Sequence, residues 1–141
     1  MGQKGAVFTT SLPLRDLAAI FREAGESARG GMGKLLELGA TMSGNSDTLG
    51  FYTPSFDSPF AAIEGSPDFA IGVNILKFNA GAQGNGTHVH MYVDDSGSER
   101  MVELFAKHGW LDGGRAARLA DQFLRAFRAA DPKLVVQESN L

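Results

Sequence analysis

Residues 87–107, THVHMYVDDSGSERMVELFAK, decide the fold, because they predict a β-hairpin within one short stretch. Strands are expected from Thr87 to Asp94 and from Glu99 to about Lys107, and the pair Ser96-Gly97 between them is typical of a tight turn. In the first strand, alternate positions are apolar, which places those side chains on one face of a sheet. The order strand, turn, strand predicts antiparallel pairing at the centre of the chain.

The residues before this hairpin extend the predicted sheet. Apolar side chains alternate with small or polar ones from Phe69 to Ile75, and the phase then slips at Leu76, which predicts a bulge or a strand buried on both faces. Shorter strands are expected at 6–10, 49–53 and 133–138. Residues 43–68, which include the second of these strands, are a long turn-rich connection between the helical region and the strand that begins at Phe69. The aromatic side chains in this connection suggest that it packs against the protein.

Helical periodicity appears in three places. After Ser11 and Pro13, which favour a helix start, an apolar face runs from Leu14 to about Ala28. A second, shorter helix is expected over 33–42. The last helix ends before Pro132, and its apolar stripe comprises Ala116, Leu119, Ala120, Phe123, Phe127 and Ala130.

These elements predict a single α+β domain over residues 1–141. Strands and helices are segregated along the chain, which favours an antiparallel sheet over an alternating, doubly wound one. We expect the stripe Leu119, Phe123 and Phe127 of the long C-terminal helix to cover one face of the sheet, because neither surface is stable when exposed. One or two short helices should follow the first strand.

Composition excludes several classes of protein. The chain of 141 residues has no cysteine, so disulfide scaffolds, thiol catalysis and cysteine-ligated metals are excluded. A formal net charge of -3 argues against general nucleic-acid binding. No apolar run approaches the roughly 20 residues that span a bilayer. A cytoplasmic protein without nucleic-acid or membrane partners is therefore expected, and no cofactor is predicted.

The segment from Thr9-Thr10-Ser11 through Leu12-Pro13-Leu14-Arg15-Asp16-Leu17 carries a resemblance to a known family. A strand that leads through a Ser/Pro turn into a helix, then antiparallel strands and a long C-terminal helix, resembles START-like, polyketide-cyclase-like helix-grip proteins. This chain shows fewer strands than that family. The resemblance implies a protein that holds an apolar ligand between helix and sheet.

His88 and His90 are a candidate metal pair. Residues two apart on a strand point to the same face, about 6–7 Å apart. With Ser96-Gly97 as the central turn residues, Glu103 faces His90, and two histidines with one carboxylate are a known ligand set for zinc or iron. The alternative is a solvated face: Val89, Met91 and Val93 are core-like, which leaves His88, His90 and Tyr92 toward water. If the long C-terminal helix covers this face instead, the two histidines and the tyrosine line an interior pocket.

The leading functional hypothesis is a non-enzymatic module that holds a small apolar ligand or a protein partner between the sheet and the C-terminal helix. The alternatives are a metal-dependent or acid–base enzyme using His88, His90 and Glu103, and a homo-oligomer whose function lies at a sheet edge. The residues predicted to contact the ligand of the binding module are Phe69, Ile71, Val73, Phe123 and Phe127, with Tyr52, Phe56 and Trp110 at the rim.

Overall fold

The computed structural model describes residues 2–42, 50–76, 87–108 and 113–141. These residues form six strands and two helices, in the order β1 (Gly2–Thr10), α1 (Leu14–Met42), β2 (Phe51–Tyr52), β3 (Phe69–Leu76), β4 (Thr87–Asp95), β5 (Arg100–His108), α2 (Gly113–Ala130) and β6 (Val135–Ser139). The predicted α+β class is confirmed, as are the strands that the sequence places before and after the central hairpin.

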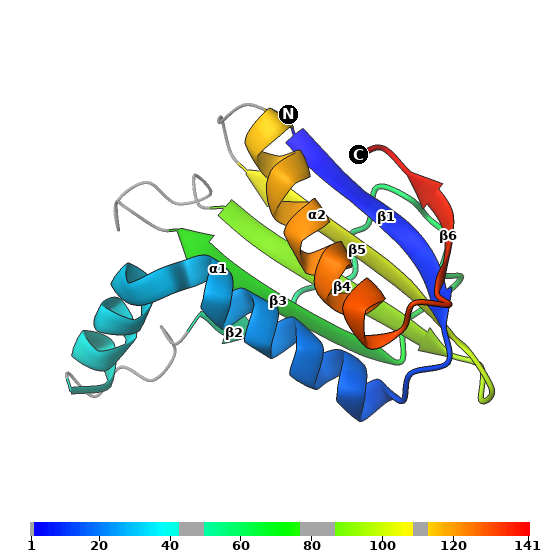
Figure 1. The fold of residues 1–141 in the computed structure, drawn as a ribbon, viewed down its shortest axis with the longest axis horizontal. Helices are drawn as coiled ribbons and strands as arrows, with labels where there is room; N and C mark the ends of the chain where they lie inside the picture. Colours follow the sequence, from blue (N-terminus) through cyan, green and yellow to red (C-terminus); the bar gives the residue numbers. More distant parts are fainter. Residues whose placement is uncertain (1, 43–49, 77–86, 109–112) are drawn as a thin grey trace.

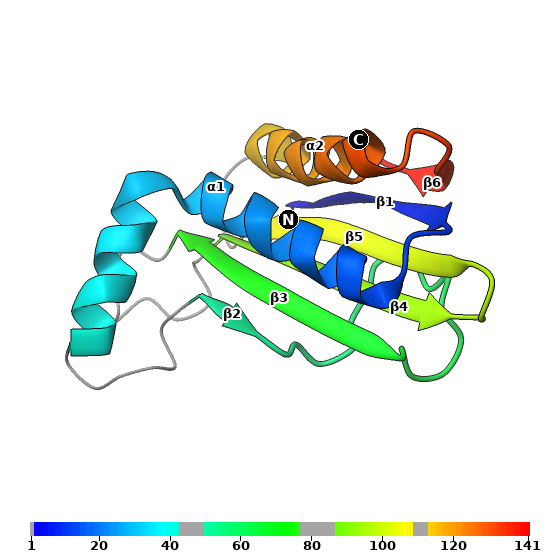
Figure 2. The same cartoon turned by 60° about the horizontal axis from the view of Figure 1, so that its bottom comes forward.

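The strands form one antiparallel sheet in the order β2-β3-β4-β5-β1-β6, so the first strand lies between the central hairpin and the last strand. The phase slip in β3 is confirmed as a register shift between Asn74 and Leu76. Both helices lie on the same side of this sheet, α1 and α2 next to each other (Figures 1 and 2). The sheet therefore has one face toward the helices, the helix face, and one face away from them.

The register of the central hairpin differs from the prediction by two residues. Asp95 pairs with Arg100, so the connection holds four residues, not two. The wider turn is stabilised from within, because the Asp95 carboxylate accepts a hydrogen bond from the Gly97 amide at 3.0 Å and the Ser96 hydroxyl donates to the Glu99 carbonyl at 2.7 Å. Gly97 has a φ of 98°, which favours glycine. A shift by two keeps every side chain on its predicted face.

The helix face carries the main core. Phe123 and Phe127 of α2 are fully buried; the Phe127 ring lies 5.4 Å from that of Phe8 on β1, and the Phe123 ring lies 5.2 Å from that of Phe21 on α1. Leu119 packs against the same core while partly exposed. The predicted covering of the sheet by the C-terminal helix is thus confirmed, and α1 shares that role.

Helix α1 corrects the prediction of two short helices. It begins after Pro13, whose carbonyl accepts hydrogen bonds from the amides of Asp16 and Leu17. The backbone stays helical to Met42, through the glycines at 30, 31 and 33 that were expected to separate two helices. The ribbon changes direction partway along (Figures 1 and 2), which is how glycine commonly affects a helix that it does not end. Within the described residues, no helix is long and apolar enough to span a membrane.

Residues 53–68, here the covering segment, lie across the face of the sheet opposite the helices. A second, smaller core forms there from Ile63 of the segment and Tyr92 and Phe105 of the sheet. For residues 50–68, the described part of the connection predicted over 43–68, the expectation that it packs against the protein is confirmed. The sheet is therefore covered by helices on one face and, around Tyr92 and Phe105, by irregular chain on the other.

Candidate functional site

The face away from the helices carries polar and aromatic side chains in three rows that cross β3, β4 and β5. We call it the histidine face. Because residues paired across neighbouring strands point to the same side, the pairings define each row. The rows are Asn74–His88–Lys107, then Gly72–His90–Phe105, then Ala70–Tyr92–Glu103.

Tyr52 of the edge strand β2 joins the two histidines. Its hydroxyl oxygen lies 2.8 Å from Nδ1 of His88 and 2.7 Å from Nε2 of His90. Tyr52 pairs with Gly72, where an added Cβ would stand 2.8 Å from the tyrosine ring and 3.0 Å from the His90 ring. Glycine at position 72 therefore leaves the space in which the Tyr52 ring lies.

Tyr92 continues the same network toward the covering segment. Its hydroxyl donates a hydrogen bond to the Ser55 carbonyl at 2.6 Å and lies 3.2 Å from Nδ1 of His90. The Asp57 amide donates to the same hydroxyl at 3.4 Å. Tyr92 is fully buried and His90 is 5% exposed, so the expected solvated face is wrong for these two residues, because the covering segment lies over them.

The donors and acceptors of this network assign the histidine tautomers. The single hydroxyl proton of Tyr92 goes to the Ser55 carbonyl, which can only accept, so Nδ1–H of His90 donates to the Tyr92 oxygen. Nε2 of neutral His90 then carries a lone pair and accepts the Tyr52 proton. The Tyr52 oxygen accepts in turn from Nδ1–H of His88, which leaves the lone pair of neutral His88 on Nε2.

Burial favours the neutral form of each inner member. Desolvation, followed by the charges of Lys107 and His88, lowers the pKa of His90 from 6.5 to about 4. Desolvation, with a smaller contribution from Tyr92, raises the pKa of Tyr52 to about 12. Burial likewise raises the pKa of Tyr92. At neutral pH the inner part of the network is therefore an uncharged hydrogen-bonded chain.

Glu103 does not join the histidines. It lies opposite Tyr92. The predicted partner, His90, is two residues away along β4, and the wider turn of the hairpin accounts for this shift. Its buried carboxyl group accepts hydrogen bonds from the Ser58 hydroxyl and, at 2.8 Å, from the Ile63 amide, and so holds the covering segment to the sheet. Among the described residues, no three histidine, aspartate or glutamate side chains are placed to hold a metal ion.

The residues predicted to contact a ligand are divided between the two faces. Ile71, Val73, Phe123 and Phe127 are buried in the core of the helix face, with Phe69 packed against it. Tyr52 and Phe56 lie on the histidine face, each more than one third exposed, where the Phe56 ring stands 5.0 Å from that of Tyr92. They do not surround a common site with the first group. Trp110 lies outside the described residues.

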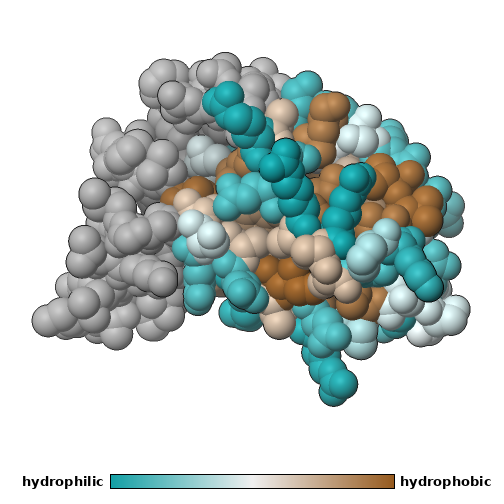
Figure 3. All heavy atoms as spheres, in the orientation of Figure 1, coloured by the Kyte–Doolittle hydropathy of each residue, from teal (hydrophilic) through white to brown (hydrophobic). Residues whose placement is uncertain are grey.

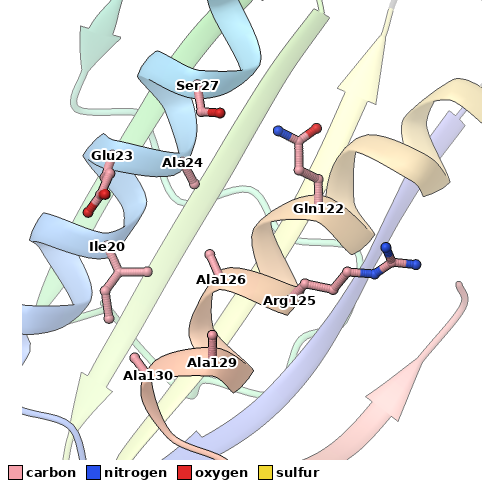
Figure 4. Close-up of a pocket in the computed structure, with 9 residues that line it drawn as sticks. All are labelled: Ile20, Glu23, Ala24, Ser27, Gln122, Arg125, Ala126, Ala129 and Ala130. Atoms are coloured by element: carbon pink, nitrogen blue, oxygen red, sulfur yellow. The ribbon is translucent and has the colours of Figure 1, made fainter.

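The helix side of the molecule offers an open groove of about 620 Å³ between α1 and α2 (Figure 4). Small apolar side chains, Ala24 and Ala126 among them, point into it. Of its charged residues, Arg125 extends away from α1 and pairs with Asp121 at 2.8 Å. Hydrophilic and hydrophobic areas alternate over this side (Figure 3), so no large apolar patch dominates the visible described surface. The groove brings together no acid–base groups comparable to those of the histidine face.

The sequence predicts the pair His88 and His90, but it carries no signal that Tyr52 bonds to both of them. Tyr52 stands in a strand of two residues, too short to show a period, and it is separated by 36 residues from His88 and by 38 from His90. Asn74 and Lys107 were also missed, although the pairing of β3 and β5 with β4 places them beside His88 once the register is known.

The chain matches no protein-family model, no curated protein and no solved structure. The resemblance to START-like helix-grip proteins therefore stays a prediction. Function has to be inferred from the histidine face itself.

Proposed function

We propose that this protein is an acid–base enzyme that moves a proton on a small molecule at the histidine face, with His88 as the general base. The observation that supports this role is the double hydrogen bond of Tyr52, at 2.8 Å to His88 and 2.7 Å to His90. An imidazole whose Nδ1–H is held in this way keeps its basic lone pair on Nε2, in a defined direction. Holding a base in one tautomer is what general base catalysis needs.

His90, Tyr52 and Tyr92 are positioning residues in this proposal. A proton could be relayed inward only if His90 accepted it from Tyr52. The pKa of His90, about 4, and that of Tyr52, about 12, strongly disfavour such a transfer. The chain therefore orients His88, and the proton taken from a substrate stays on His88 until it is returned.

The other hypothesis from the sequence, an apolar ligand between the sheet and α2, has less support. Val73, Phe123 and Phe127 are fully buried, and the two phenylalanines are in ring contact with other core residues. A ligand at that position would have to displace packed side chains, at a cost of several kcal/mol (about 3–5 for one phenylalanine). The histidine face requires no such displacement of the main core.

A generic carbon acid tests the proposal. A base that removes the ring proton of 5-nitrobenzisoxazole breaks its N–O bond and releases a coloured cyanophenolate, so the rate follows by absorbance. We expect catalysis by the wild-type protein and a loss of about 10²-fold or more in His88→Gln, in line with removal of a general base. The matched control is His108→Gln, which removes the third histidine of the chain.

Two results would overturn the proposal. One is a wild-type rate no higher than that of buffer with the same concentration of imidazole. The other is a His88→Gln protein that is folded by circular dichroism and as active as His108→Gln.

A further inference from the structure

Three donor atoms from two strands lie next to one another on the histidine face. The hydroxyl oxygen of Tyr52 lies 2.8 Å from Nδ1 of His88 and 2.7 Å from Nε2 of His90. The centroids of the two imidazole rings are 6.2 Å apart, and the Tyr52 ring is nearly perpendicular to both rings. Two nitrogen atoms and one oxygen atom are therefore close enough to share a single ion.

The spacing of these atoms resembles that of metal ligands. Nitrogen and oxygen ligands bind transition metals at about 2.0 Å, so neighbouring ligands stand about 2.8 Å apart in a square plane and about 3.3 Å apart in a tetrahedron. The distances of 2.8 and 2.7 Å agree with the square-planar value. Square-planar sites of nitrogen and oxygen are typical of copper(II) and nickel(II), and copper(II) binds such ligands more tightly.

His90 is already prepared as a ligand by the residue behind it. Its Nδ1–H donates to the Tyr92 hydroxyl, which donates in turn to the Ser55 carbonyl at 2.6 Å. A histidine that binds a metal almost always donates its other ring N–H group to a partner of this kind, which fixes the tautomer and the orientation of the ring. Nε2 of His90 therefore carries the lone pair that an ion needs.

Tyr52 provides both the third donor and the access from solvent. Its side chain is 37% exposed and His88 is half-buried, whereas His90 is buried. Lys107, which pairs with His88 from β5, brings a positive charge that opposes a cation here. The negative charge of an ionised Tyr52 offsets it. Without a metal the Tyr52 hydroxyl keeps its proton, since its pKa is raised to about 12, but a bound dication favours the ionised form.

We propose that Tyr52, His88 and His90 bind a copper(II) ion, through the tyrosine oxygen, Nδ1 of His88 and Nε2 of His90. Binding displaces the hydroxyl proton of Tyr52 and the proton on Nδ1 of His88 from these two atoms. The ion and the hydrogen bonds of Tyr52 therefore exclude each other. The inference goes beyond the proposed function and does not rest on it, because the proposed function concerns the metal-free chain.

Titration of the full chain with copper(II) sulfate tests the site. We expect one ion to bind per chain at micromolar concentration. A bound tyrosinate should give an absorption band in the visible range, because charge transfers from its oxygen to copper(II). Electron paramagnetic resonance of the same sample should show splitting by two nitrogen ligands, one from each histidine.

Three variants assign the ligands. Tyr52→Phe should lose the absorption band and bind copper at least about tenfold more weakly. Tyr92→Phe removes only the partner of His90 Nδ1, so it should keep the band and bind about tenfold more weakly. The matched control is His108→Gln, which removes the third histidine of the chain and should keep both the band and the affinity. Circular dichroism confirms the fold of each variant.

A wild-type protein that binds no copper at micromolar concentration, or binds it without the absorption band, would overturn the inference. A band that persists in Tyr52→Phe would overturn it as well. Should that variant fail to fold, the spectrum of the wild type decides, since splitting by fewer than two nitrogen ligands excludes the histidine pair. These failures leave the cleavage of 5-nitrobenzisoxazole by chelator-treated protein untouched, whereas a failure of the proposed function appears as that cleavage persisting in His88→Gln.

Discussion

The two faces of the sheet are both covered, but by different means. The helix face is closed by two helices whose apolar stripes pack against sheet side chains such as Phe8 and Val73, both of which are fully buried. The histidine face is closed by the irregular covering segment, which contacts the sheet through hydrogen bonds to Tyr92 and Glu103 and a small apolar cluster around Ile63. Stability should therefore reside mainly in the first face, and chemistry in the second.

The largest difference between the faces should appear on removal of an aromatic ring. Phe123→Ala, in the core of the helix face, should lower the free energy of unfolding by about 3–5 kcal/mol. Phe56→Ala, on the histidine face, should cost about 1 kcal/mol, because its ring is 38% exposed and makes one ring contact with Tyr92. Urea unfolding measures both. A similar loss of unfolding free energy in the two variants would contradict the proposed difference in stability between the two faces.

A second prediction concerns the attachment of the covering segment. Glu103→Ala leaves the Ser58 hydroxyl and the Ile63 amide without their acceptor and empties a fully buried site, so we expect a loss of about 2–3 kcal/mol. Glu103→Gln keeps one acceptor oxygen and should cost about 1 kcal/mol. The same variants should increase cleavage by protease within residues 53–68. A resistant segment in Glu103→Ala would show that its attachment does not depend on this carboxyl group.

The histidine face should also make stability depend on pH. The unfolded chain protonates His90 near pH 6.5, but the folded chain does so only near pH 4. Between these values the unfolded state binds more protons, so stability falls as the pH is lowered from 6.5 to 4, by about 2 kcal/mol, and is fully retained above 6.5.

The control for this pH effect is His90→Gln, which removes the titrating group and keeps an acceptor for Tyr52. Other groups titrate in the same range, so the measured quantity is the difference between wild type and variant in unfolding free energy at pH 7 and at pH 4. We expect the variant to lose less stability on acidification. An identical loss would mean that His90 is protonated in the folded state as readily as in water.

The helix face was largely predictable from the sequence, because local periodicity defines it. The alternation in β3 and the spacing of Phe123 and Phe127 in α2 each place side chains on one side of a single element. No knowledge of distant contacts is needed for that. The same reasoning separated Met91 from His90, which lie on opposite faces of β4 as expected.

The histidine face was predictable only in part, because long-range contacts build it. The position of Glu103 depends on the length of a turn, which hydrogen bonds of Asp95 and Ser96 set at four residues. The contacts of Tyr52 depend on an edge strand of two residues and on the space above Gly72. Such features have no periodic signal in the sequence. Individual residues of the histidine face could therefore be predicted as candidates, but their mutual contacts could not.

A substitution with a small expected effect on stability is the most informative one for the histidine face. Tyr52→Phe removes one hydroxyl group and both of its contacts with the histidines, at a cost of about 1 kcal/mol. The tautomer of His88 should change, because nothing in this network then holds its proton on Nδ1. Nitrogen chemical shifts of the imidazole rings report this directly: we expect Nδ1–H in the wild type and a shift toward Nε2–H in the variant.

Tyr92→Phe is the control, since it removes the partner of His90 Nδ1 and leaves the bond between Tyr52 and His88 in place. It should alter the signals of His90, and it should change those of His88 less than Tyr52→Phe does, because the Tyr52 hydroxyl stays beside His88. If Tyr52→Phe leaves the His88 signals as they are, the hydroxyl group of Tyr52 does not position this histidine, and the difference between a structural and a chemical face of the sheet loses its main support.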